Sequence, residues 1–242
     1  MKRLFAILFA LCSLADPACA AGDEVAYAAM GDSPPLPYLL TRGAGSPQFT
    51  KPAYGVILMP GGLGVLEPRT VKGRLAFRAG GDFLIRSRLW FTTGPFVAAS
   101  TDATNEPGPI LAIAADLKKR FGPLAVYVIG TSRSTEATMR LAAPLDGQVA
   151  GFVHTSSMNA IASFDPRRFT SRHLMVMHKL DACRVTLPSN SEAAHRSFGT
   201  ELIVMAGGKS EVEACDPRAY HGYNGIERET VDRIKAWIAA GK

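Results

Sequence analysis

Short hydrophobic runs alternate along the chain with segments whose apolar residues recur at helical spacing. The runs predict buried β-strands at residues 54–59, 96–100, 124–129, 148–154, 172–178 and 201–205. The helical segments cover residues 83–91, 110–121, 135–142, 190–197 and 226–240. Strands that are apolar throughout are buried on both faces, so this alternation predicts an α/β fold, with a mostly parallel, twisted sheet and helices on both of its faces.

The segment before these elements has a weaker pattern. Residues 21–52 are rich in Gly, Pro and Ser, with candidate short strands at 24–29 and 38–41. We expect this segment to wrap one edge of the domain and to belong, with the rest of residues 21–242, to a single domain. The 242 residues are 47% hydrophobic and 20% charged, a composition that suits one globular domain with a substantial core.

Residues 1–20 form a separate segment. Lys and Arg at residues 2–3 precede an apolar run at 5–11, and a small-residue Ala-Cys-Ala run ends at Ala20. These features predict a secretory signal peptide cleaved near Ala20, and therefore a periplasmic or secreted protein. A lipoprotein signal at Cys19 is the alternative, which the preceding Asp-Pro pair disfavours. No later stretch has the apolar length of a transmembrane helix, so no membrane anchor is expected.

Removal of such a leader leaves Cys183 and Cys215 as a pair of cysteines. In an oxidising compartment we expect them to form a disulfide, the alternative being two buried free thiols. Closing a loop of roughly 33 residues contributes on the order of 3 to 4 kcal/mol to stability in the chain-entropy treatment. The two cysteines have no Cys or His partners at metal-ligand spacing, so no metal site is expected.

The charge balance is mildly basic. The full chain has a net charge of +6, and the predicted leader holds two cations and one anion, so its removal leaves +5. No run of basic residues is interleaved with aromatic ones, and nucleic acid is therefore not an expected partner.

The stretch LAVYVIGTSRSTEAT, residues 124–138, joins a predicted strand to a predicted helix. Its centre carries Ser132, with Gly130 and Ser134 two positions to either side. A tight strand-to-helix corner strains the backbone of its central residue and needs small neighbours, because strand and helix approach each other closely there. We interpret Ser132 as a nucleophile, and the alternative is a serine in an ordinary strand-to-helix turn.

A serine nucleophile needs a base, and the chain has five histidines. His221 lies in an irregular loop between the last predicted strand and the last predicted helix. An imidazole in such a loop can reach over the sheet, so we favour His221 as the base. The other histidines are expected to have structural roles, and they are His154, His173, His178 and His195.

The base in turn needs a carboxylate to orient it. Asp181 directly follows the strand at residues 172–178 and is the favoured candidate, with Asp102 and then Asp216 as alternatives. The competing role for each of them is a turn or a helix cap, which is common for Asp in loops. The expected disulfide favours Asp181, because it would tie the loop of this residue to the loop of His221.

A glycine-rich turn, residues 61–64, follows the strand at 54–59. It lacks the Lys and Ser/Thr of a P-loop and the spacing of a dinucleotide fingerprint, which excludes a phosphate cradle. As an oxyanion hole it would present the N–H of Gly62 or Leu63 beside the N–H of Arg133; a plain turn is the alternative. Functional residues lie beyond the carboxyl ends of parallel strands, so this turn, the serine and the aspartate are expected at one edge of the sheet.

From the first apolar strand to the C-terminus, the order of glycine turn, serine elbow, late aspartate and final histidine resembles the α/β-hydrolase superfamily. The compact chain and the GTSRS elbow look like small exported bacterial serine hydrolases of the dienelactone-hydrolase and esterase branches. The resemblance implies an eight-stranded sheet without a large lid domain, and a Ser132–His221–Asp181 triad. Two positions depart from the family pattern: Ser134 replaces the second glycine of the elbow, and Pro60 stands where many lipases carry a histidine.

The resulting hypothesis is an exported serine hydrolase that cleaves small-molecule carboxylic esters through an acyl-enzyme, with no metal or organic cofactor. One alternative is an exported binding or accessory protein that has the hydrolase fold and a hydrolase-like pocket but no catalytic activity. Hydrolysis of amides, thioesters or polyesters is a further alternative. The residues expected near the mouth of the site, as pocket walls or as packing residues, are Leu63, Val65, Met158, Tyr220 and Tyr223.

Overall fold

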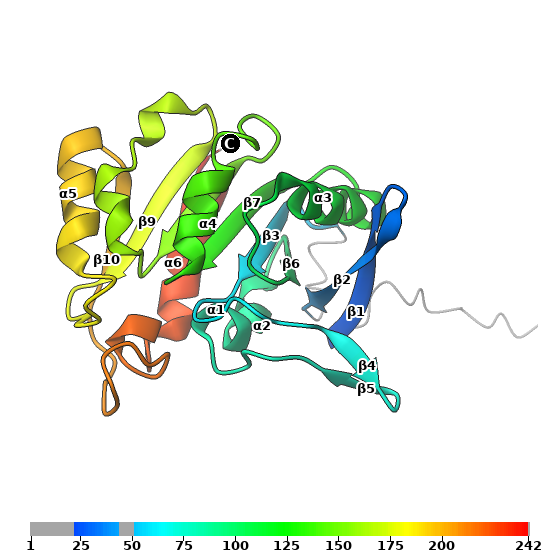
Figure 1. Ribbon diagram of the computed structural model, residues 1–242, viewed down its shortest axis with the longest axis horizontal. Helices are drawn as coiled ribbons and strands as arrows, with labels where there is room; N and C mark the ends of the chain where they lie inside the picture. Colours follow the sequence, from blue (N-terminus) through cyan, green and yellow to red (C-terminus); the bar gives the residue numbers. More distant parts are fainter. Residues whose placement is uncertain (1–21, 44–50, 242) are drawn as a thin grey trace, which may run out of the picture.

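A computed structural model describes residues 22–43 and 51–241 of the chain. Its centre is an eight-stranded sheet with the strand order β1-β2-β6-β3-β7-β8-β9-β10 (Figure 1). The strands are β1 (Gly22–Met30), β2 (Ser33–Arg42), β3 (Tyr54–Met59), β6 (Phe96–Ser100), β7 (Ala125–Thr131), β8 (Gly151–Thr155), β9 (Arg172–His178) and β10 (Glu201–Met205). From β6 to β10 in this order the strands run parallel, whereas β1 and β2 form an antiparallel hairpin that pairs with β6 at one edge.

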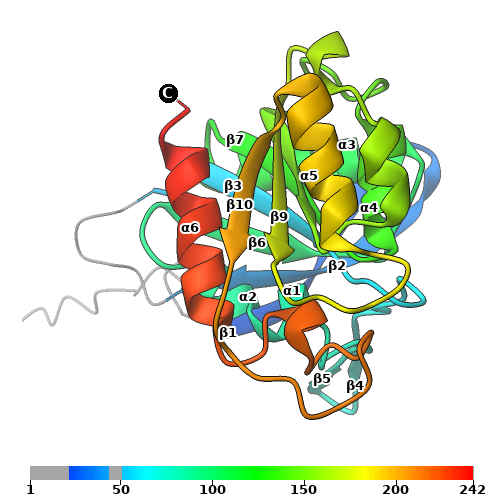
Figure 2. The ribbon, with the colours of Figure 1, turned by 90° about the vertical axis from the view of Figure 1, so that its left-hand side faces the viewer.

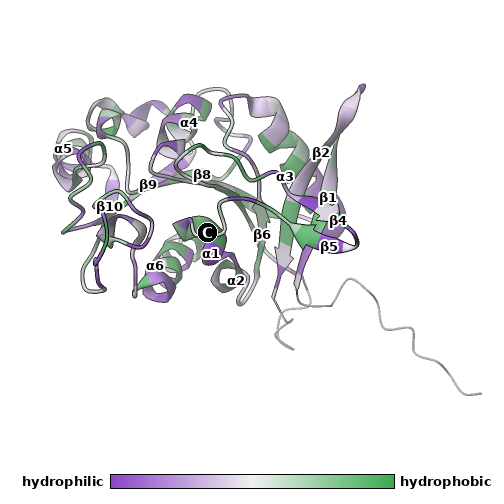
Figure 3. Ribbon diagram, turned by 60° about the horizontal axis from the view of Figure 1, so that its bottom comes forward, coloured by the Kyte–Doolittle hydropathy of each residue, from purple (hydrophilic) through white to green (hydrophobic). Residues whose placement is uncertain are grey.

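Helices cover both faces of the sheet (Figure 2, Figure 3). One layer consists of α3 (Pro107–Phe121), α4 (Ser134–Leu141) and α5 (Pro188–Phe198), and the other of α1 (Phe83–Arg86), α2 (Arg88–Phe91) and α6 (Glu227–Ala239). Successive side chains of a strand enter opposite layers. In β3, Ile57 and Met59 pack with α3 and α4, while Val56 and Leu58 pack with α1, α2 and α6. Burial on both sides explains the apolar runs, and the predicted fold class is confirmed.

Most elements lie within a few residues of their predicted bounds. β3, β6, β9 and β10 have the predicted bounds, because each is a short apolar run closely flanked by residues that break the pattern. The helix expected at 83–91 is divided at Ser87 into α1 and α2, and the two N-terminal strands are longer than expected. A small hairpin of β4 (Arg69–Val71) and β5 (Arg74–Ala76) is not predicted, since its short strands are largely exposed and leave no apolar run.

The carboxyl ends of parallel strands bring the candidate chemistry to one edge of the sheet. The glycine turn follows β3, Ser132 follows β7, and Asp181 comes shortly after β9. β3 and β7 are neighbours in the sheet, and β8 alone separates β7 from β9. His221 reaches the same edge from the segment between β10 and α6.

The predicted signal peptide, with Cys12 and Cys19, lies outside the described residues. Across residues 22–43 and 51–241, no helix combines the length and the apolar character needed to cross a bilayer.

Candidate active site

Ser132 occupies the corner between β7 and α4. Its backbone has a φ of +51°, in the left-handed region that residues with a Cβ rarely adopt. Gly130 sets the close approach of strand and helix, because a Cβ there would lie 2.6 Å from the carbonyl oxygen of Ser134. Gly61 packs against the same corner, where its Cβ would lie 3.1 Å from Ser132 Cβ. A strained serine with small neighbours is the arrangement of a nucleophile elbow.

The second small residue of the elbow, Ser134, is buried at the start of α4. Its hydroxyl donates a hydrogen bond to the backbone carbonyl of Pro60. The serine in place of the second glycine of the elbow therefore contacts the proline that precedes the glycine turn. Their hydrogen bond connects the helix after the serine to the glycine turn.

Asp181 and His221 form a buried pair. Asp181 Oδ2 lies 3.0 Å from His221 Nδ1, and the side chains are 1% and 7% exposed. The other carboxylate oxygen, Oδ1, accepts the N–H of Cys183 at 2.9 Å. Thr186 Oγ1 lies 3.1 Å from Asp181 Oδ2 and 3.1 Å from His221 Nδ1. The imidazole thus turns Nδ1 towards the acid, which leaves Nε2 for proton transfer.

Two further contacts restrain the loop that carries the histidine. His221 lies in the 3-10 helix η4 (Tyr220–Gly222), and its backbone carbonyl accepts the Ser156 hydroxyl at 2.6 Å. The expected disulfide is present, with the Cα atoms of Cys183 and Cys215 4.7 Å apart. It connects the loop of Asp181 to the loop of His221.

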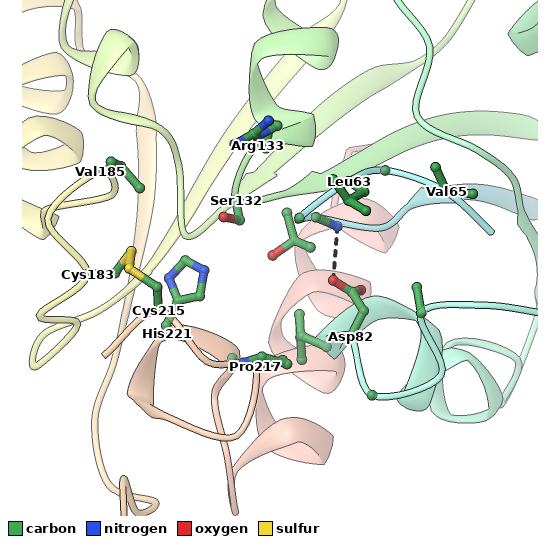
Figure 4. A pocket seen from close by; sticks show the side chains of 18 of the residues that line it. Leu63, Val65, Asp82, Ser132, Arg133, Cys183, Val185, Cys215, Pro217 and His221 are labelled. Atoms are coloured by element: carbon green, nitrogen blue, oxygen red, sulfur yellow. Dashed lines mark hydrogen bonds between the residues drawn. A yellow bond between two sulfur atoms is a disulfide. The ribbon is translucent and has the colours of Figure 1, made fainter. Parts of the chain in front are cut away.

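Ser132 and His221 line the same cavity, and Figure 4 shows the serine hydroxyl and the imidazole next to each other at its wall. Within the described chain, neither the hydroxyl nor His221 Nε2 forms a hydrogen bond. Catalytic hydrogen bonds are often long in unliganded enzymes and tighten when substrate binds. The placement is therefore compatible with proton transfer from the serine to the histidine.

The glycine turn presents free amides beside the serine. The Gly61 N–H donates to Asp82 Oδ2 at 2.9 Å, and the Gly64 N–H donates to the Gly61 carbonyl at 2.9 Å. Between them, the N–H groups of Gly62 and Leu63 have no acceptor among the residues that the structure describes. Gly62 has a φ of +61°, a conformation that glycine adopts readily.

The N–H of Arg133, directly after Ser132, likewise has no acceptor in the described part of the chain. Arg133, Gly62 and Leu63 all line the cavity together with Ser132. Unpaired amides around a serine are what an oxyanion hole requires.

The alternative acids are engaged elsewhere. Asp102 Oδ1 accepts the N–H groups of Leu66 and Glu67 at 2.5 and 2.9 Å. Asp216 accepts the N–H of Arg218 at 2.7 Å. Both residues therefore have the turn-capping role that competes with catalysis for aspartates in loops.

The remaining histidines have partners away from the cavity. His154 Nε2 and His173 Nδ1 lie 3.2 Å apart in a buried pair. His178 and His195 each contact a backbone carbonyl, at 2.9 and 2.7 Å. These contacts are typical of structural histidines, the role expected for all of them.

The cavity has a volume of about 680 Å³. Its apolar walls include Val65, Phe83, Met158, Val185 and Pro217, together with the disulfide. Among the described residues, no group of three or more His, Cys, Asp or Glu is placed to hold a metal ion.

Three of the residues expected at the mouth line the cavity, namely Leu63, Val65 and Met158. The two tyrosines do not. Tyr220 stacks on His178 with ring centroids 4.6 Å apart. Tyr223 is fully buried and donates its hydroxyl proton to the Val176 carbonyl at 2.8 Å. Both tyrosines are packing residues.

Neither a protein-family model nor a curated protein matches the sequence, whereas many solved structures match the fold. Est1E from Butyrivibrio proteoclasticus is similar with a TM-score of 0.61 at 13% identity, over 90% of this chain and 98% of the other. XC6422 from Xanthomonas campestris, a serine hydrolase without a lid, has a TM-score of 0.58 at 10% sequence identity, over 90% of this chain and 98% of the other. The dienelactone hydrolase of Anabaena variabilis is similar with a TM-score of 0.56 at 12% sequence identity, over 89% of this chain and 95% of the other. This chain has the α/β-hydrolase fold.

The α/β-hydrolase fold also brings two polar residues to the site that the sequence does not single out. Asp82 caps α1 and binds the glycine turn, and Thr186 contacts both members of the Asp181–His221 pair. An Asp before an apolar helical run is a recognisable N-cap pattern. No local pattern indicates the contact of Asp82 with the glycine turn, and none marks Thr186.

Burial changes the pKa of several side chains in this fold. It raises the pKa of the Asp82 carboxyl, against the opposing effects of its backbone N–H donors and the nearby Arg86 charge. It lowers the pKa of His173 to about 4. Burial, reinforced by His173, holds the pKa of His154 well below its ordinary value. The paired histidines are therefore neutral near pH 7.

Proposed function

We propose that this protein is a serine hydrolase that cleaves carboxylic esters through an acyl-enzyme. The observation that carries the proposal is the buried 3.0 Å contact between Asp181 and His221, at a cavity that also contains the strained Ser132. An aspartate that accepts a hydrogen bond from Nδ1 fixes the tautomer in which Nε2 can take a proton.

In the proposed reaction, Ser132 Oγ attacks the acyl carbon while its proton passes to His221 Nε2. The N–H of Arg133 and that of Gly62 or Leu63 hold the oxyanion of the tetrahedral intermediate. Collapse of the intermediate breaks the bond to the alcohol, which leaves with the proton of the imidazolium. Water then repeats the sequence on the acyl-enzyme, releasing the carboxylic acid and restoring the serine.

Because the cavity walls are largely apolar, we expect the substrates to be esters with apolar acyl and alcohol groups. Because His221 protonates the leaving group, the alcohol lies on the side of the histidine, along Val185 and the disulfide (Figure 4). The acyl group then lies on the far side of the serine, along Leu63 and Val65. Thioesters, amides and polyester chains would use the same groups with a different leaving atom or a longer chain.

The test is turnover of p-nitrophenyl butyrate together with covalent labelling by a fluorophosphonate. We expect the native protein to be active and labelled, and Ser132→Ala to lose both. Ser189→Ala, which changes an exposed serine on α5, is the matched control and should retain both. Labelling that survives in Ser132→Ala would contradict the assigned nucleophile. A native protein that is folded yet neither labelled nor active would favour the binding or accessory function.

A further inference from the structure

One helical turn contacts both loops of the site. This turn is α1 with its N-cap, residues 82–86; the loops are the glycine turn, residues 61–64, and the histidine loop, residues 215–223. We propose that Asp82 and Arg86 are positioning residues, which hold the oxyanion amides and the catalytic histidine at fixed places across the cavity. The inference rests on the proposed hydrolase function.

The carboxylate of Asp82 has two separate roles. Its Oδ1 accepts the N–H groups of Leu84 and Ile85, at 2.9 and 3.4 Å, and thereby caps α1. Its Oδ2 accepts the N–H of Gly61 at 2.9 Å, and this hydrogen bond runs along the cavity wall (Figure 4). The first role stabilises the helical turn, and the second connects that turn to the glycine turn.

The contact with Gly61 restrains a particular peptide unit. The peptide between Pro60 and Gly61 is held at both ends, because its carbonyl accepts the Ser134 hydroxyl and its N–H donates to Asp82. The next residue, Gly62, has no atom within 4 Å of the position a Cβ would take. The hydrogen bonds of the preceding peptide, together with the close packing of Gly61 against Ser132, therefore restrain the direction of the amides that follow.

Arg86 extends from the same helical turn to the histidine loop. Its Nη2 donates to the backbone carbonyl of Gly222 at 2.6 Å and pairs with Glu227 at 3.0 Å. Its Nη1 donates to the Gly81 carbonyl at 2.8 Å, and the side chain is only 19% exposed. Gly222 directly follows His221, so a shift of this arginine would move the base.

The two contacts have a common kinetic consequence. One restrains the donors that meet the developing negative charge, and the other restrains the group that takes the proton. Both act on the transition state, so their loss should lower kcat more than it changes KM. A misplacement of about 1 Å in such groups costs on the order of 10²-fold in rate.

Asp82→Ser separates the two roles of the carboxylate. Serine is a good N-cap, so α1 keeps its cap, but its side chain is too short to reach Gly61. We expect kcat for p-nitrophenyl butyrate to fall about 10- to 100-fold, with KM changed less than about twofold. Affinity for an alkyl boronic acid, which forms a tetrahedral adduct on Ser132, should fall by a similar factor.

The matched control is Asp165→Ser, because Asp165 also caps a helical turn, by accepting the N–H of Arg167 at 3.1 Å, but does not line the cavity. It should leave kcat and boronate affinity unchanged. If Asp82→Ser lowers only the melting temperature, with kcat of the folded protein and boronate affinity unaltered, Asp82 is a helix cap and no more.

Arg86→Met is compared with Arg88→Met. Arg88 is similarly buried, at 15% exposure, and pairs with Asp23 at 2.6 Å away from the cavity. We expect Arg86→Met to lower kcat about 10-fold and Arg88→Met to leave it unchanged, even where both lose stability. Equal kcat values in the two variants would overturn the role of Arg86. If the native protein is folded but inactive, both the proposed function and this inference are wrong. If the native protein is active and the Asp82 and Arg86 variants keep its kcat, only the inference is wrong.

Discussion

The hydroxyl of Ser134 donates a hydrogen bond to the backbone carbonyl of Pro60, and so joins the helix after Ser132 to the glycine turn. Ser134 is only 2% exposed, so water does not readily replace it as the donor to this carbonyl. A serine in the second small position of the elbow therefore has a structural role of its own. It adds a hydrogen bond that a glycine cannot form.

Ser134→Ala leaves that carbonyl without a donor. We expect the free energy of unfolding to fall by about 1 to 3 kcal/mol. We also expect kcat to fall several-fold, because the glycine turn loses a restraint. Urea unfolding and ester kinetics measure the two effects. Ser171→Ala is the matched control, since this buried serine also donates to a backbone carbonyl, that of Val149 at 3.1 Å, outside the cavity. A Ser134→Ala variant with native kcat would contradict the prediction.

Thr186→Val removes a hydroxyl beside the Asp181–His221 pair at nearly constant side-chain volume. A hydrogen bond to a charged carboxylate contributes about 1.5 to 3 kcal/mol, so we expect kcat to fall about tenfold or more while KM stays near its native value. Thr186→Ser keeps the hydroxyl and should recover most of the activity. The role assigned to the hydroxyl fails if the serine variant is as slow as the valine variant.

Reduction of the Cys183–Cys215 disulfide should lower both the stability of the protein and its kcat for esters. The cysteines are 32 positions apart, and opening a loop of this size lowers the free energy of unfolding by about 3 to 4 kcal/mol. Because the bridge joins the loops of Asp181 and His221, kcat should fall as well. Denaturant midpoints with and without dithiothreitol measure the first effect. The double variant Cys183→Ser/Cys215→Ser should show no response to dithiothreitol, and a native protein that also shows none would contradict the prediction.

The buried histidine pair predicts a loss of stability in acid. His173 has a pKa of about 4 in the folded protein and an ordinary value of 6.5 when unfolded, so the unfolded chain binds more protons between these values. The free energy of unfolding has its full value, as far as His173 is concerned, above pH 6.5. It falls by about 3 kcal/mol as the pH is lowered from 6.5 to 4, because the unfolded chain takes up the proton first. His173→Phe, whose ring can pack against Phe152 and Phe164, should flatten this dependence in chemical unfolding at each pH. Equal slopes for the variant and the native protein would contradict the assignment.

The layers of the fold and the position of the serine follow from local patterns in the sequence. Buried strands such as β3 and β9 are short apolar runs because both of their faces are covered. Ser132 is marked by small residues at fixed distances, since the steric requirement of a tight corner acts within a few residues. The exposed β4–β5 hairpin leaves no such pattern, and neither does the division between α1 and α2.

The contacts within the site depend on residues that meet only after folding. The sequence offers three aspartates for His221, and the structure puts Asp181 within 3.0 Å of it while Asp102 and Asp216 cap turns. Other contacts join distant residues in the same way: 21 positions separate Gly61 from Asp82, and 136 separate Arg86 from Gly222. Periodicity and spacing report on neighbours along the chain. Which polar side chain completes a hydrogen bond across a cavity is decided by the packing of sheet and loops in three dimensions.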